Sequence, residues 1–124
     1  MPKKNTKNEL MQLQEKVKKF CEARDWDQFH TAKDLAIGIS TEANELLDLF
    51  RFKSNKEVLK KFKNNKDKTE IENELADVLF FVLRFAQMNN IDLAEAINSK
   101  MKISHKKYPV AKSKGSNKKY TELW

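Results

Sequence analysis

Residues 71–85 read IENELADVLFFVLRF, and the spacing of their apolar side chains decides the fold. Neither glycine nor proline interrupts the stretch, and residues 75–83 are apolar nearly all round, which is typical of the central helix of a bundle. The apolar stripe of this helix consists of Ile71, Val78, Phe81 and Phe85. Two acids, Glu74 and Asp77, lie in the middle of that stripe, where they cannot easily reach open water.

A second helical stretch, residues 31–52, has the same anomaly. Its apolar stripe consists of Leu35, Ile39, Leu46 and Leu49. Glu42 and Glu45 fall on that stripe, and the three-residue spacing of each acidic pair places its side chains about 5–6 Å apart. Like charges about 5 Å apart repel by roughly 3 kcal/mol at an effective dielectric near 20. Four such carboxylates in one site must therefore be protonated, paired with lysines or bound to cations.

The four acids are a set of oxygen ligands without histidine, which suits Mg²⁺ or Mn²⁺. A ferritin-like di-iron site would have Glu-x-x-His on its helices, and neither pair has it. One Glu-x-x-Glu pair is common on any solvated helix, but two pairs on two apolar stripes favour a metal site. The predicted metal ligands are Glu42, Glu45, Glu74 and Asp77.

The composition excludes several classes of protein. The 124 residues have room for one domain with a single core, and 40% apolar with 35% charged residues argues against both disorder and a membrane span. The N-terminus lacks the apolar segment of a secretory signal, so we expect a cytoplasmic protein. Cys21 is the single cysteine, which excludes an internal disulfide. Gly38 and Gly115 are too few glycines for a phosphate loop or a dinucleotide fingerprint.

We predict an all-α bundle of four to five helices. The expected helices span about 6–23, 31–52, 55–63, 68–89 and 92–107. Each begins with a capping side chain three residues ahead of an acid: Thr6 and Glu9, Thr31 and Asp34, Ser54 and Glu57, Asp67 and Glu70, and Asp92 and Glu95. Residues 1–108 are the expected helical domain, and 109–124 are expected to form a basic tail with little to pack, which orders on a ligand.

The net charge of +7 lies entirely in residues 100–124, which contain eight lysines and one acid. Residues 1–99 contain 17 basic and 17 acidic residues and are neutral overall. An anion bound by this protein is therefore expected to meet the C-terminal segment.

The acidic pairs are also arranged as in a known family. Glu42-x-x-Glu45, followed after 28 residues by Glu74-x-x-Asp77, resembles the E-x-x-E and E-x-x-D signature of the MazG-like all-α nucleoside triphosphate pyrophosphohydrolases. Four further blocks resemble the dCTP pyrophosphatase branch of that family: residues 24–30 (RDWDQFH), 99–101 (SKM), 108–109 (YP) and 115–123 (GSNKKYTEL). The resemblance covers nearly the whole chain.

This resemblance implies a helical bundle that assembles as a homodimer or homotetramer, binds Mg²⁺ at the four acids and cleaves a dNTP to monophosphate and pyrophosphate. The expected substrate is dCTP or a modified dCTP, and Glu42 or Glu45 orients the attacking water or takes its proton. The implied substrate-binding residues are Trp26, His30, Phe52, Lys53, Phe81, Lys100, Ser104, Tyr108, Lys118 and Lys119. Phe52 stands where the branch often has tryptophan, Phe81 where it often has tyrosine, and Ser104 where it often has asparagine.

Two other functions remain open at this point. A non-catalytic helical module could bind nucleic acid through its basic tail, and a helical scaffold could bind a protein partner. Neither explains acids on two apolar stripes. We therefore expect a small-molecule dNTP substrate and neither a membrane nor a nucleic-acid partner.

Overall fold

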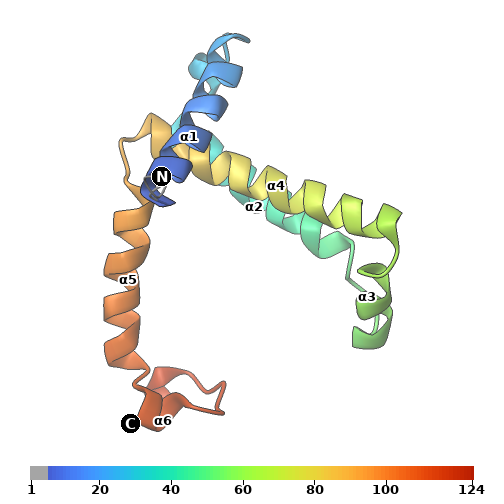
Figure 1. Cartoon of the computed structure of the whole chain (residues 1–124), viewed down its shortest axis with the longest axis vertical. Coiled ribbons are helices and arrows are strands. Elements are labelled where there is room, and N and C mark those ends of the chain that lie inside the picture. The colour runs from blue at the N-terminus through green and yellow to red at the C-terminus, as the bar shows by residue number, and fades with distance from the viewer. Residues whose placement is uncertain (1–5) are drawn as a thin grey trace, which may run out of the picture. The chain divides into compact units, whose positions relative to one another are not determined.

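A computed structural model describes residues 6–124, in which helices are joined by turns and no β-strand occurs (Figure 1). The elements are α1 (Thr6–Glu22), η1 (Asp27–Phe29), α2 (Ala32–Asp48), α3 (Asn55–Lys61), α4 (Asn65–Met88), α5 (Leu93–Lys107), α6 (Val110–Ser113) and η2 (Tyr120–Glu122), of which η1 and η2 are single 3-10 turns. The predicted all-α class is confirmed. None of the described helices is both long and apolar enough for a bilayer crossing.

Three of the predicted helix starts have the expected side-chain cap. The Ser54 hydroxyl accepts from the Glu57 N–H at 3.2 Å while the Glu57 carboxylate accepts from the Ser54 N–H at 3.1 Å, which completes a capping box. Thr31 and Asp92 cap α2 and α5 in the same way, each accepting a backbone N–H three residues on. α1 begins at Thr6, whose side chain lies outside the described part of the chain.

The boundaries of α2 and α4 differ from the prediction. α4 begins at Asn65 because the Asn64 side chain, rather than that of Asp67, caps it by accepting the Asp67 N–H at 3.1 Å. Asp67 instead lies in the first turn, where its negative charge favours the N-terminal end of the helix dipole. α2 ends at Asp48, four residues early, and the chain turns through Phe52 at a φ of 63°.

Contacts divide the chain into two units: the first ends at Ile91 and the second begins at Asp92. In the first unit α4 packs against both α1 and α2, as its apolar sequence predicts (Figure 1). α2 and α4 run antiparallel. His30, just before α2, contacts Arg84, whereas Gly38, further along α2, lies against Phe81, which comes before Arg84 on α4. Among the described residues of this unit, the buried apolar side chains are Cys21, Leu35, Ile71, Leu83 and Ala86.

In the second unit, residues 109–124 fold back on the end of α5. The Tyr120 N–H donates to the Tyr108 hydroxyl at 3.1 Å, and the Trp124 indole N–H donates to the Lys107 carbonyl at 3.4 Å. The Lys112 ammonium lies 3.6 Å from the centre of the Trp124 ring, a cation–π contact. This segment therefore has packing of its own, which the sequence-based expectation of a bare tail did not include.

Candidate metal centre

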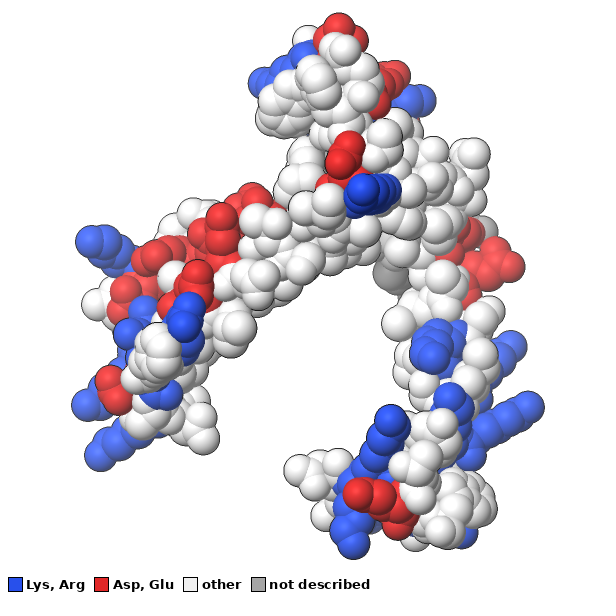
Figure 2. Space-filling view, turned by 180° about the vertical axis from the view of Figure 1, so that it is seen from behind, with Lys and Arg blue, Asp and Glu red and all other residues white. Residues whose placement is uncertain are grey.

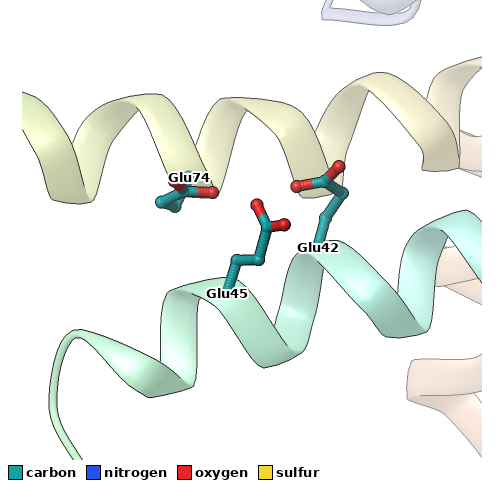
Figure 3. A group of neighbouring side chains, drawn as sticks. All are labelled: Glu42, Glu45 and Glu74. Carbon is teal, nitrogen blue, oxygen red and sulfur yellow. The ribbon is translucent and has the colours of Figure 1, made fainter.

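Three glutamates from two helices point toward one another (Figure 3). Glu42 and Glu45 project from α2 and Glu74 projects from α4, and one carboxylate oxygen of each lies within 4.8 Å of the others. Glu42 and Glu74 are half-buried, whereas Glu45 is exposed. The antiparallel helix pair and the three-residue spacing on α2 produce this arrangement, and acidic side chains gather along the pair in Figure 2.

The electrostatics of the cluster disfavour three free carboxylates. Burial raises the pKa of Glu42 to about 7, and the neighbouring Glu45 carboxyl adds to that shift. Burial is also the main cause that raises the pKa of Glu74, followed again by Glu45. Both shifts mean that the negative form is poorly solvated and repelled by its neighbours, so the cluster gains stability from a bound proton or cation.

Asp77 lies one helical turn beyond Glu74 on α4 and is exposed. Its oxygens do not join the 4.8 Å group, although its charge contributes, after burial and Glu45, to the raised pKa of both Glu42 and Glu74. The structure thus brings together three of the four predicted ligands and keeps the fourth within electrostatic reach. The role of Asp77 as a ligand stays a prediction.

Oxygen atoms without partners indicate that the cluster fits a cation. Oε2 of Glu42 and Oε2 of Glu74 are both buried, and neither has a hydrogen-bond partner in the described part of the chain. No described lysine or arginine forms an ion pair with the three glutamates. A buried charged oxygen left unpaired costs on the order of several kcal/mol, which a hard divalent cation would offset. The residues present therefore fit Mg²⁺ or Mn²⁺.

The predicted base-pocket residues lie in one aromatic cluster. The Trp26 ring is 5.7 Å from Phe20 and 6.1 Å from His30, measured between ring centroids. Phe80 links Phe20 to Phe81, with centroid distances of 5.9 and 5.6 Å. Trp26, His30 and Phe81 are thus connected through Phe20 and Phe80, although they come from the α1–α2 connection and from α4.

Phe52 and Lys53 follow α2 in the turn that leads to α3. The Phe52 side chain is 93% exposed, and the Arg51 guanidinium lies 4.5 Å from the centre of its ring. Lys53 lines a surface pocket of about 370 Å³ together with residues of α3, among them Lys60 and Lys61. Neither Phe52 nor Lys53 belongs to the carboxylate group.

The other five predicted substrate-binding residues belong to the second unit. Lys100, Ser104 and Tyr108 are spaced four residues apart along α5 and at its end, which places them on one face of that helix. Lys119 precedes η2, and the Lys118 N–H donates to the Ser116 hydroxyl at 3.2 Å. Their contact with a phosphate stays a prediction.

The sequence analysis missed Arg84. Its side chain is fully buried, and its guanidinium donates to the side chains of Asp27, His30 and Gln87. The signal that could have revealed it is a charged residue directly after the run VLFFVL at 78–83, where an apolar side chain is expected.

Comparison with known proteins identifies the family of this chain. The chain matches the MazG-like family over residues 37–123. It is 38% identical over 104 residues to dCTP pyrophosphatase 1 of Rattus norvegicus and 35% identical to that of Homo sapiens, covering 84% of this chain in each case. The chain spans 61% of the length of these relatives.

A solved structure has the same fold. It is a pyrophosphatase from Archaeoglobus fulgidus, 33% identical, with a TM-score of 0.74 over 88% of this chain and 97% of that one. The residues matched by the family, 37–123, include all four acids: Glu42, Glu45, Glu74 and Asp77. The chain therefore belongs to the MazG-like family.

Proposed function

We propose that this chain is a Mg²⁺-dependent nucleoside triphosphate pyrophosphohydrolase that converts a dNTP to dNMP and pyrophosphate. The observation that carries the proposal is the pair of unpartnered oxygens, Glu42 Oε2 and Glu74 Oε2, in a three-carboxylate cluster. The names of the relatives, dCTP pyrophosphatase and pyrophosphatase, support this reaction and favour dCTP or a modified dCTP. The proposed role is nucleotide-pool cleansing in the cytoplasm.

The three glutamates differ in ways that suit different tasks. When bound, Mg²⁺ or its substitute Mn²⁺ supplies an acidified water and neutralises phosphate charge. Glu42 and Glu74 would hold the cation through their buried oxygens, with Glu45 and Asp77 as the other two ligands. Glu45 is exposed, so its carboxylate reaches solvent and would orient the attacking water or take its proton.

The spacing along α4 suits a nucleotide. Glu74 and Phe81 are seven residues apart on one helix face, a rise of about 10 Å. Phosphates held by the carboxylate end would place the base near the cluster of Trp26, His30 and Phe81. Residues 100–124 of the second unit carry the excess positive charge, and their lysines are proposed to bind phosphate.

We also propose self-association as a homodimer or homotetramer. Leu75 and Leu79 lie one turn apart on α4 and are 57% and 44% exposed, although the helix is the central one of the first unit. An apolar face of this kind on a central helix favours a second copy of the chain. Light scattering after gel filtration should give the mass of two or four chains, and a monomer would contradict this part of the proposal.

The reaction is tested by product analysis. Purified protein with Mg²⁺ and a panel of dNTPs should release monophosphate and pyrophosphate, and Glu42→Gln or Asp77→Asn should abolish release while circular dichroism shows an intact fold. Glu72→Gln is the matched control, because Glu72 lies on the same helix as Asp77, is exposed and carries the same charge as the two acids. Orthophosphate as the only product would overturn the proposal.

A further inference from the structure

The buried Arg84 joins α4 to the connection between α1 and α2. Its Nε donates to Nδ1 of His30 at 2.9 Å, one terminal nitrogen pairs with the Asp27 carboxylate, and the other donates to Gln87 Oε1 at 2.6 Å. Asp27 opens η1 and His30 closes it, so one side chain holds both ends of the turn. A fully buried arginine is rare unless it is paired, and here three of its N–H groups have partners.

The bond to His30 determines which ring nitrogen carries the proton. A guanidinium N–H can only donate, so Nδ1 of His30 must be the acceptor and must lack a proton. The neutral ring then carries its proton on Nε2. If Nδ1 of this ring were also protonated, its N–H would face the Nε–H of Arg84, and the positive imidazolium would lie beside the positive guanidinium.

The charges around the ring agree with this assignment. The pKa of His30 is lowered, first by burial and then by the positive charge of Arg84. Asp27 and Asp34 act in the opposite direction without cancelling the effect. The lowered pKa favours the neutral form of the imidazole, which lies beside Trp26 with the two ring centroids 6.1 Å apart.

We propose that Arg84 is a positioning residue for the nucleoside end of the site: it fixes His30 as the Nε2–H imidazole and so presents one oriented hydrogen-bond donor to an acceptor atom of the bound nucleoside. The role in substrate binding rests on the proposed function, whereas the tautomer does not. Arg84 itself acts through His30 and the turn that begins at Asp27, not through contact with the reacting phosphates.

The first test needs no substrate. Two-bond ¹H–¹⁵N correlation spectra of histidine-labelled protein report which ring nitrogen is protonated, and a His30→Gln variant separates the His30 signals from those of His105. At about pH 8, where the ring is neutral, wild type should show His30 as the Nε2–H form, and Arg84→Met should give a mixture of tautomers. An Nδ1–H form in wild type, or an unchanged tautomer in Arg84→Met, would overturn the assignment.

Two further variants guard against a folding defect. Arg84→Lys keeps the buried charge, but the lysine cannot donate to Asp27 and His30 together. This variant should therefore also give a mixture of tautomers. Gln87→Met is the matched control: it removes one partner of the same guanidinium and leaves the bonds to Asp27 and His30 in place. It should keep the wild-type spectrum.

The second test asks whether Arg84 acts through His30 in substrate binding. Arg84→Lys should raise KM for the preferred dNTP about three- to tenfold, the effect of losing one neutral hydrogen bond, with kcat within about twofold of wild type. In a His30→Ala background the same change should have no further effect on KM.

The kinetic outcomes separate the two proposals. If wild type hydrolyses dNTPs but the effects of Arg84→Lys and His30→Ala on KM add, the positioning role is overturned and the proposed function stays intact. A wild-type protein that hydrolyses no dNTP would overturn the proposed function, and the spectra would still decide the tautomer.

Discussion

The ring of Phe81 on α4 lies directly over Gly38 of α2: a Cβ built on Gly38 would be 2.5 Å from both Cδ1 and Cε1 of the ring. Real side chains do not approach so closely, so glycine is what allows the ring to lie against the backbone of α2. Gly38 precedes Glu42 by one helical turn, and Phe81 follows Asp77 by one turn. This contact therefore helps to set the helix spacing beside the carboxylates.

Gly38→Ala should destabilise the first unit. The added methyl group would force the Phe81 ring or the helices to move, an overpacking cost of about 1–3 kcal/mol that exceeds the gain of up to about 1 kcal/mol in helix propensity. Urea unfolding measures the net loss. In a Phe81→Ala background the same change should be neutral or stabilising, and a loss there equal to that in wild type would contradict the assigned contact.

The metal-free protein should lose stability as the pH rises from about 5 to about 8. The pKa of Glu42 is near 4.5 when unfolded and about 7 when folded, so in this window the folded state binds more protons than the unfolded state, and raising the pH favours unfolding. Urea unfolding in EDTA measures this slope. Glu42→Gln should flatten it, whereas Glu72→Gln should keep it.

Excess Mg²⁺ should stabilise the protein increasingly over the same pH range, because the cation competes with protons for Glu42 and Glu74. Thermal melts with Mg²⁺ and with EDTA measure the difference at each pH. It should vanish in Glu74→Gln. A stabilisation by Mg²⁺ that persists in this variant would place the cation elsewhere.

Phe52 should matter for substrate more than for stability. Its φ of 63° is unfavourable for a bulky side chain, and its ring is 93% exposed, so the ring adds little to the core of one chain. Phe52→Gly should leave the free energy of unfolding unchanged or raise it by up to about 1 kcal/mol, while KM for the dNTP rises. Phe52→Trp, which keeps a ring, should preserve KM. Equal kinetics in Phe52→Gly and wild type would exclude a role in binding.

Lys118 and Lys119 should bind phosphate rather than stabilise the fold. Both are exposed, so replacing the pair with alanine should raise KM for the dNTP several-fold and leave the melting temperature unchanged. Lys114→Ala is the control, an exposed lysine in the same unit. Loss of salt-dependent DNA binding with unchanged dNTP hydrolysis would instead favour the nucleic-acid alternative.

Sequence patterns predicted the elements whose cause is local. The start of α3 at Ser54 and the placement of Glu42 and Glu45 on one face of α2 follow from capping chemistry and helical spacing, which a few neighbouring residues determine. The early start of α4 shows the limit, because Asn64 and Asp67 are both able to cap a helix. Local chemistry alone does not choose between them.

Features that depend on contacts between distant residues were missed. Arg84 bonds to His30 across 54 residues, and the Tyr120 N–H bonds to Tyr108 across 12. No periodicity relates the members of either pair. The sequence therefore indicates that Arg84 follows an apolar run and that the C-terminal segment is rich in lysine, but it does not indicate what either one contacts.

The complete burial of Cys21 has a practical consequence for work in solution. Burial raises the pKa of its thiol, so the reactive thiolate is scarce and air oxidation cannot link two folded chains through it. A maleimide reagent will label this position only when α1 separates from the rest of its unit. The rate of labelling thus measures local opening of α1.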